Sequence, residues 1–505
     1  MRTILISGLL LIFLITGHSE AQTLFPVDGA TKVNPDVQLK LTFKSIPKVG
    51  TSGLIRIIDA ATGKVVDTLD MSIPAGPTKP VDPAIRAKNY LGFPYPYART
   101  SRPTNRDTKP GTPSAGAVPT SNEYQLTIIG GFTDGFHFYP ITIDGNTATI
   151  HPHHDLLEYG KTYYVEIDST VLQLDSGEFK GIAKNTWRFT TKKSAPRTNA
   201  KRLTVSADGS GAFNTVQGAV DFVPDNGKQR VTIYVKNGLY EEIVYARNKT
   251  NVTLVGESRD KTIVRYQNNE VFNPHPANIR TNPEKGTFPS RRAAVTIDNC
   301  DDIHIANITL QTTAFGQAEG LLITGDRNIL SNVTVIGSGD ALQANGRIYL
   351  VDSMIDGAGD TILGRGTLFC ERCTIKSTSV MMWPRNKEGI HGNVFKDSKF
   401  IGTRNPTTIA RSPRNESFTY PYAEVVLLNA TLTNIAPEGW SDADKGGNVR
   451  FWEFESKNPD GSLVDVSRRV PWSRQLDKVK DAKLIADYSR PEFVLGGWEP
   501  RLSLK

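Results

Sequence analysis

The sequence contains few cysteines: Cys300, Cys370 and Cys373 are the only three among 505 residues. So low a number excludes a disulfide framework as the main support of the fold. Cys370 and Cys373 form one Cys-x-x-Cys pair, and the sequence has no second pair to complete a zinc site. We therefore interpret all three as core residues and expect a large hydrophobic core to stabilise the chain.

Long apolar runs are also absent after the first residues, since no later segment approaches the roughly 18 apolar residues of a membrane-spanning helix. The chain opens MRTILISGLLLIFLITGHSEAQ, with Arg2, an apolar run and then Ser19-Glu20-Ala21. This order is typical of a secretory signal peptide, which we assign to residues 1–21. We expect an exported protein without membrane insertion that is secreted, periplasmic or attached to the cell surface.

A strong charge of one sign is missing as well. The 59 Lys and Arg residues face 52 Asp and Glu residues, which gives a formal net charge of +7. An excess this small for the length is compatible with an anionic substrate but does not identify one, and we expect no nucleic-acid partner.

Short alternating stretches such as VQLKLTF, LIRIIDA and TYYVEID fill residues 24–193 and predict a β-sandwich. The segment PVDGATKVNPDVQLKLTF resembles the immunoglobulin-like (Ig-like) modules of exported bacterial enzymes. An insertion at about residues 74–119 carries ten prolines and predicts an extended loop rather than core strands. His151, His153 and His154 have a proline among them, and we interpret them as a solvated loop rather than a metal site.

A linker at residues 194–202 leads into a second region, residues 203–505. Its segment AFNTVQGAVDFV has apolar residues at helical spacing and predicts an amphipathic helix. The segments ANITL, SNVTV, VDSMI, ERCTI, KDSKF and LNATL then recur at offsets of 25, 20, 20, 25 and 32 residues. Irregular steps of this size without intervening helices predict a parallel β-helix whose open end the helix caps. We therefore expect an all-β chain, a β-sandwich followed by a parallel β-helix.

Two near-copies, IGSGDAL and DGAGDTI, place Asp340 and Asp360 twenty residues apart. If one coil has twenty residues, the spacing of parallel strands stacks the two carboxyls within roughly 5 Å, and Gln317 occupies the coil before. Carboxyls this close need a shared proton or a cation. The pattern leaves three interpretations open: turn aspartates, a calcium site between coils, or an ionised nucleophile beside a protonated acid.

The series of motifs from about residue 202 to residue 498 resembles the pectin methylesterases, a family of right-handed parallel β-helix enzymes. The resemblance is carried by RLTVSADGSGAFNTVQGAVDFV, FGQAEGLLITGDRNILSNVTVIGSGDAL, GRIYLVDSMIDGAGDTILG and IARSPRN…IAPEGW, in the family's order. It implies hydrolysis of the methyl esters of galacturonate units in pectin, with release of methanol. We expect no cofactor and no metal, because an ester needs only a nucleophile, an acid and oxyanion donors.

Four residues match the family's catalytic positions. The resemblance implies that Asp360 is the nucleophile and that Asp340 protonates the departing methanol and later activates water. It implies that Gln317 donates a hydrogen bond to the oxyanion and that Arg411 keeps Asp360 ionised and oriented.

The chain departs from the family in two places. Gly339 stands where the family has a second oxyanion glutamine, and Gln343 is our candidate replacement. The tryptophan that follows the family's arginine is missing after Arg411, and Trp440 in PEGW is our candidate for stacking on a sugar ring. Four arginines could hold free carboxylates along the polymer: Arg365, Arg385, Arg404 and Arg414.

Two other function classes remain open. A pectate-cleaving lyase or hydrolase on the same fold is favoured by Arg411-Ser-Pro-Arg414, but the sequence shows no cluster of calcium-binding aspartates and no Gly-His-Gly. A non-catalytic polysaccharide-binding β-helix protein is favoured by the loss of glutamine at Gly339. In each case we expect a monomer whose partner is a pectic polymer.

Overall fold

A computed structural model of the chain describes residues 23–79, 124–129, 136–274, 291–411, 420–441 and 448–502. The expected signal peptide lies outside these residues, and so do Arg414 and the proline-rich insertion beyond residue 79. Within the described ranges, no helix combines the length and apolar character needed to cross a membrane.

The N-terminal part is a β-sandwich of two main sheets, with strand orders β1-β3-β10-β9 and β2-β13-β11-β5-β6. Alternate residues point into the space between them: Leu41, Ile57 and Trp187 are buried in one core cluster. The strands are β1 (Thr23–Phe25), β2 (Ala30–Val33), β3 (Leu39–Thr42), β4 (Pro47–Val49), β5 (Leu54–Asp59), β6 (Val65–Asp70), β7 (Leu126–Thr127), β8 (Phe136–His137), β9 (Ile141–Asp144), β10 (Thr147–Ile150), β11 (Thr162–Ile167), β12 (Leu172–Leu174) and β13 (Arg188–Thr191).

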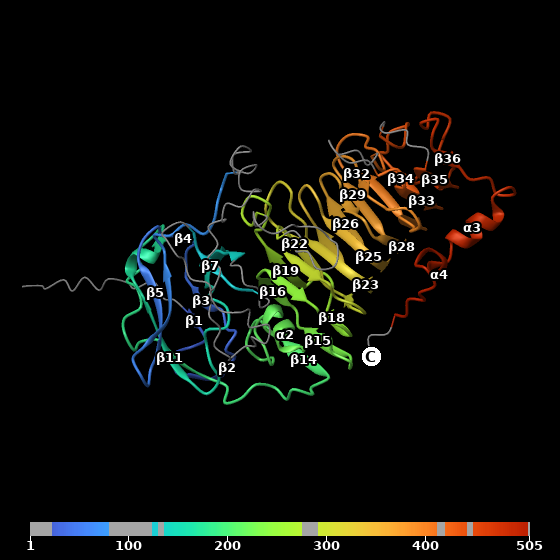
Figure 1. The fold of residues 1–505 in the computed structure, drawn as a ribbon. Helices are drawn as coiled ribbons and strands as arrows, with labels where there is room; N and C mark the ends of the chain where they lie inside the picture. Colours follow the sequence, from blue (N-terminus) through green and yellow to red (C-terminus); the bar gives the residue numbers. More distant parts are fainter. Residues whose placement is uncertain are drawn as a thin grey trace, which may run out of the picture.

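The second part is a parallel β-helix built from two long sheets, as the repeat predicts (Figure 1). The fifteen-stranded sheet contains β14 (Arg202–Val205), β15 (Val231–Val235), β17 (Val244–Arg247), β18 (Val252–Gly256), β20 (Val295–Asp298), β21 (His304–Ala306), β23 (Leu321–Ser331), β25 (Leu342–Val351), β27 (Ile362–Gly364), β28 (Thr367–Glu371), β30 (Met382–Pro384), β31 (Asn393–Lys396), β33 (Glu424–Leu428), β35 (Arg450–Phe454) and β36 (Arg474–Gln475). The eight-stranded sheet contains β16 (Gly238–Glu241), β19 (Thr262–Tyr266), β22 (Thr309–Thr312), β24 (Thr334–Ile336), β26 (Met354–Gly357), β29 (Thr374–Ser377), β32 (Lys399–Gly402) and β34 (Thr431–Thr433).

Equivalent residues of successive coils stack inside the β-helix. Leu321 pairs with Leu342, Leu342 with Ile362 and Ile362 with Met382, and all four are fully buried. Burying an aliphatic side chain of this size stabilises the fold by about 1.5–3 kcal/mol relative to exposure. Such apolar ladders hold the coils in register. The three cysteines are free and lie in this core, as expected.

One corner of the β-helix has the same backbone conformation in successive coils. At the turn from the fifteen-stranded to the eight-stranded sheet, one residue per coil adopts a left-handed conformation, with φ between 51° and 55°. Asn and Asp tolerate this conformation better than other side chains, which accounts for the polar residue near the start of most sequence repeats. The corner residues are Asn307, Asn332, Asp352, Arg372, Asp397 and Asn429.

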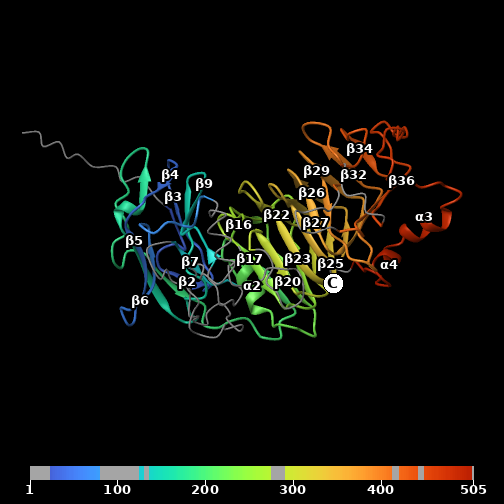
Figure 2. The same cartoon turned by 45° about the horizontal axis from the view of Figure 1, so that its top comes forward.

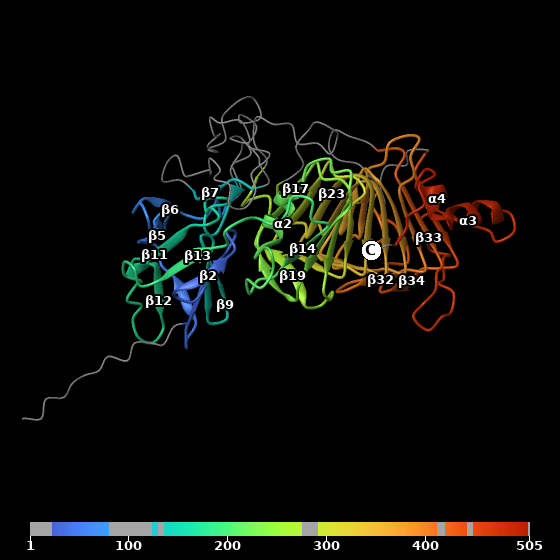
Figure 3. The same cartoon turned by 90° about the horizontal axis from the view of Figure 1, so that it is seen from below.

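The predicted amphipathic helix is α2 (Val216–Phe222), whose residues are all buried. It begins at Thr215, whose Oγ1 accepts a hydrogen bond from the Gly218 N–H. The helix lies over the first coils, between the β-helix and the sandwich (Figures 1 and 3). Asp36 of the sandwich reaches across: its Oδ2 accepts from the N–H groups of Asn214 and Thr215, each at 2.9 Å. The sandwich thus docks on the capped end of the β-helix.

The opposite end carries α3 (Ala482–Tyr488) and α4 (Pro491–Val494), as Figure 2 shows. Tyr488, Val494 and Leu495 pack against apolar side chains on the outer face of the fifteen-stranded sheet. The C-terminal segment therefore covers a surface that the sequence pattern did not assign to any partner.

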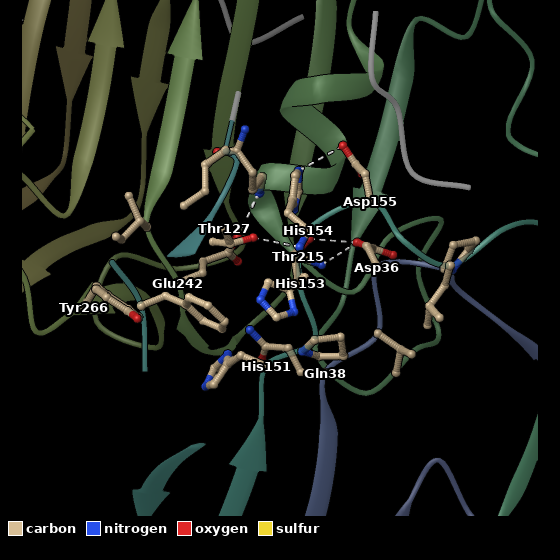
Figure 4. A pocket seen from close by; sticks show the side chains of 18 residues that line it. Asp36, Gln38, Thr127, His151, His153, His154, Asp155, Thr215, Glu242 and Tyr266 are labelled. Atoms are coloured by element: carbon tan, nitrogen blue, oxygen red, sulfur yellow. Dashed lines mark hydrogen bonds and ion pairs between the residues drawn. The ribbon is translucent and has the colours of Figure 1, made fainter. Parts of the chain in front are cut away.

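A cavity of roughly 100 Å³ lies where the sandwich meets α2 (Figure 4). His151 and His153 line it at 9% and 2% exposure, so the expectation of a solvated loop is wrong. His153 Nδ1 lies 2.7 Å from Asp67 Oδ1, and His154 Nε2 lies 2.6 Å from Asp221 Oδ2 on α2. The sequence pattern does not reveal that this segment packs against other strands of the sandwich and that His154 contacts the cap of the second domain.

Candidate active site

Gln317, Asp340 and Asp360 lie on three successive connections from the eight-stranded sheet to the fifteen-stranded sheet. We call this side of the β-helix the loop edge. Backbone hydrogen bonds hold the connections in register, from Gly339 N to Gly316 O at 2.6 Å and from Gly359 N to Gly339 O at 2.9 Å. The residues directly after these glycines are the three predicted site residues, so the loop edge brings them together in the order expected from the sequence.

Arg411 joins the site from a later connection of the loop edge. Its Nε and Nη2 atoms donate to the two oxygens of Asp360, at 2.8 and 2.6 Å. A planar guanidinium that binds both oxygens fixes the orientation of a carboxylate as well as its charge. Asp360 itself adopts a left-handed backbone conformation with φ 44°, which turns its side chain out of the strand path.

Asp340 is buried and has a different environment. Burial raises its pKa to about 7; Arg292 acts in the opposite sense, while the negative charges of Glu319 and Asp360 reinforce the rise. The two carboxyls therefore differ as an acid–base pair requires, because Asp360 has a bidentate cation and Asp340 is desolvated.

The outer face of β25, β27 and β30 lies beside these carboxyls. Gln343 pairs with Leu363, and Leu363 with Trp383, so the three side chains form one column on that face. The Gln343 side chain makes no hydrogen bond to any described residue, and its Oε1 is buried. The guanidinium of Arg411 lies 4.0 Å from the ring centre of Trp383. Trp383 therefore stands beside the arginine whose neighbouring tryptophan is missing from the sequence motif.

Trp440 does not reach this site. It is only 1% exposed and packs against Phe451, with ring centres 5.0 Å apart, inside the core of the β-helix. A ring enclosed in this way offers no face to a sugar, so the expectation that Trp440 stacks on substrate is wrong. The sequence shows an aromatic residue near the right motif but not the direction in which it points.

Two of the predicted arginines stack on successive coils next to the Gln343–Trp383 column. Gly364 of β27 pairs with Pro384 of β30. Arg365 and Arg385 directly follow these two residues and lie twenty residues apart, so they occupy equivalent positions on neighbouring coils. Burial and the charge of Arg365 lower the pKa of Arg385 to about 10. Neither guanidinium forms an ion pair with a described carboxylate. Arg404 is exposed on the same edge of the β-helix.

The main site residues that the sequence did not predict are Arg292, Glu319 and Trp383. Arg292 donates to Glu319, Gln317 and Asp340 and is only 8% exposed. One signal was present in the sequence: QAEGL has Glu319 where the family motif has an apolar residue, and a buried glutamate needs a cation. No spacing connects Arg292 to it, because the arginine lies one coil earlier.

A second cluster, at the domain junction, could hold a metal ion. His154, Asp155 and Asp221 each present one ligand atom, all within 4.8 Å of one another. The two oxygens of Asp221 already accept from Gln217 Nε2, at 2.8 Å, and from His154. Burial opposes the charge on His154, yet Asp155, Asp221 and Glu242 together raise its pKa to about 9. We therefore interpret the cluster as an ion pair between the sandwich and α2 and not as a metal site.

Comparisons with known proteins identify a family for the chain. The family model described as Pectinesterase matches residues 202–497, more than half of the chain. Pectinesterase 31 of Arabidopsis thaliana is 29% identical over 293 residues, which cover 55% of this chain and 88% of the relative. Pectinesterase QRT1 of the same plant is 30% identical over 323 residues, covering 59% and 81%. The solved structure of pectin methylesterase PemA from Erwinia chrysanthemi shares 21% identity at a TM-score of 0.47, covering 61% of this chain and 100% of that one. Since the family model spans more than half of its length, the chain belongs to the pectinesterase family.

Proposed function

We propose that the chain hydrolyses the methyl esters of galacturonate units in pectin and releases methanol and free carboxylate. One observation carries this proposal: Asp360 receives two hydrogen bonds from Arg411, while Asp340, on the coil before, has a pKa raised to about 7 by burial. An ionised nucleophile beside a protonated acid supplies the two groups that this kind of ester cleavage uses.

In the first step, a carboxylate oxygen of Asp360 attacks the ester carbonyl carbon and forms a tetrahedral intermediate. The amide of Gln317 donates a hydrogen bond to the oxyanion, and we propose that the unbonded amide of Gln343 supplies the second donor. Asp340 gives its proton to the methoxy oxygen as the C–O bond breaks, so methanol leaves and an anhydride with Asp360 remains. Asp340, now ionised, takes a proton from the water that cleaves the anhydride and restores both carboxyls.

The finer statements about this chain are also proposals. We propose that it is exported after loss of residues 1–21 and acts as a monomer on pectin outside the cytoplasm. We propose the division into an Ig-like module at 24–193, a linker at 194–202 and a catalytic domain at 203–505. Arg365 and Arg385 lack carboxylate partners among the described residues, which supports a role in holding free carboxylates of the polymer.

The test is methanol release from highly methylated pectin by the chain without residues 1–21. Asp360→Asn should abolish release. Asp352→Asn is the matched control, because Asp352 lies on the same coil but only forms a half-exposed pair with Arg372. Wild-type protein that binds pectin but releases no methanol would favour the polysaccharide-binding alternative. An unsaturated, ultraviolet-absorbing product would instead indicate a lyase.

A further inference from the structure

Arg292 sits at the centre of a buried charge network beside the two carboxyls. Its Nε and Nη2 donate to Glu319, at 2.9 and 2.7 Å, and Glu319 is fully buried. Its Nη1 donates to Glu270 Oε2 at 2.9 Å and to Gln317 Oε1 at 2.5 Å. Its Nη2 also donates to Asp340 Oδ2 at 2.5 Å. One cation therefore contacts three carboxyls and an amide.

These contacts use the whole hydrogen-bonding capacity of the guanidinium. Arginine has five N–H groups, one on Nε and two on each Nη. The Nε group and one Nη2 group bond to Glu319, the other Nη2 group bonds to Asp340, and the Nη1 groups bond to Glu270 and Gln317. No N–H is left for a reaction intermediate, so Arg292 acts through its neighbours and not on the ester.

The contact with Gln317 fixes which end of its amide faces outward. Because Oε1 accepts from Arg292, the two Nε2–H groups lie on the other side of the amide. A flipped amide would place those N–H groups against the N–H groups of the guanidinium, which repel them. Arg292 therefore holds Gln317 as a hydrogen-bond donor, the form that stabilisation of an oxyanion requires.

The contact with Asp340 has a corresponding effect. Since Oδ2 accepts from Arg292, the proton of the acid lies on Oδ1. The charged groups that face Asp340 are Arg292 and Arg385, which favour ionisation, and Glu319 and Asp360, which oppose it. Glu319 thus has two effects, since it holds Arg292 in place and offsets part of its charge.

The backbone at Gly339 leaves no room for the second glutamine of the family. A Cβ atom built at Gly339 would lie 2.7 Å from the carbonyl oxygen of Gly316, closer than a side chain tolerates. The short hydrogen bond between these two glycines closes the position. The backbone therefore excludes the family's second glutamine at position 339.

We propose that Arg292, held by Glu319, is a positioning residue that orients the Gln317 amide and the Asp340 carboxyl for ester cleavage. This inference rests on the proposed function. It assigns the orientation of Gln317 and Asp340 to a buried arginine–glutamate pair.

The test compares Glu319→Gln and Arg292→Lys with wild type, measuring kcat and KM for methanol release across pH. Glu319→Gln removes a negative charge that opposes ionisation of Asp340, so the alkaline limb of kcat/KM should move to lower pH. Arg292→Lys keeps the positive charge but loses the planar guanidinium that contacts Glu319, Gln317 and Asp340 together. The kcat should therefore fall at least tenfold, while KM changes less than threefold. Glu453→Gln is the matched control, because Glu453 forms a similarly buried bidentate pair with Arg469. It should leave the limb in place.

Thermal melting shows which variants fold. If Glu319→Gln does not fold, Glu270→Gln replaces it, because it releases part of the charge of Arg292 and should move the limb in the same direction. If wild type releases methanol but the folded variants keep the same alkaline limb of kcat/KM and the same kcat, the positioning role alone is overturned. Absence of methanol release by wild type would instead refute the proposed function.

Discussion

Replacement of Arg411 tests how the nucleophile is held. The side chain donates two charge-assisted hydrogen bonds to Asp360, at 2.8 and 2.6 Å. Hydrogen bonds to charged groups contribute about 1.5–3 kcal/mol each. The pair is partly exposed, at 32% for Arg411 and 18% for Asp360, so the low end applies, about 3 kcal/mol in all. Since about 1.4 kcal/mol corresponds to a factor of ten, Arg411→Gln should lower kcat/KM about a hundredfold.

The conservative variant should give an intermediate result. Lysine at position 411 keeps a positive charge but cannot bind both oxygens of Asp360, and it loses the planar contact with Trp383 at 4.0 Å. We expect a loss of about tenfold. Arg197→Gln is the control, because Arg197 is an exposed arginine of the linker whose side chain has no partner among the described residues.

The assay is the initial rate of methanol release over a range of pectin concentrations, with thermal melting to verify folding. The reasoning would be refuted by an Arg411→Gln variant within about fivefold of wild type. It would also be refuted by Arg197→Gln losing as much activity as Arg411→Gln, since the effect would then come from surface charge.

Three further predictions follow from the described contacts. Asp340 must be protonated to act as an acid and its pKa is about 7, so kcat/KM should fall as the pH rises above 7; a profile still rising at about pH 8 would contradict this. Arg385→Gln should raise KM several-fold for partly de-esterified pectin but not for fully methylated pectin, and equal effects on both would argue against carboxylate binding. The pKa of His154 is about 9 in the fold and about 6.5 when free, so its stabilisation is complete below about pH 6.5 and is lost as pH rises through 9. The difference in Tm between wild type and His154→Asn, measured by calorimetry, should therefore close by about pH 10, and a constant difference would exclude this ion pair as its source.

The spacing of repeated segments was enough to predict the β-helix and the meeting of its main site residues. In a solenoid, equal offsets place residues at equal positions, so Asp340 and Asp360 had to stack once the coil length was known. Gln317 followed from the same counting. Arg411 did not, because its connection is longer than a coil, and only the family resemblance placed it there.

The remaining features depend on directions and contacts that spacing does not encode. Trp440 follows a family motif but points inward. His151 and His153 are buried among residues of their own sandwich, and His154 contacts Asp221 of the second domain. Arg292 is linked to its partners only through packing between coils. In each case the deciding information is which face of a segment another segment covers.

The left-handed corner residues keep one edge of six successive coils fixed, whereas the loop edge varies in length. The connections there range from residues 358–361 to the long stretches 267–294 and 403–423. The strands on either side of these long connections remain paired in the ladder, so insertions at this edge are compatible with the fold where the polymer would bind. The exception is the short connections carrying Asp340 and Asp360, where a single added residue would put the acid and the nucleophile out of step. The architecture thus allows insertions in the long connections to change substrate preference. The reaction itself depends on the fixed length of the short connections that carry Asp340 and Asp360.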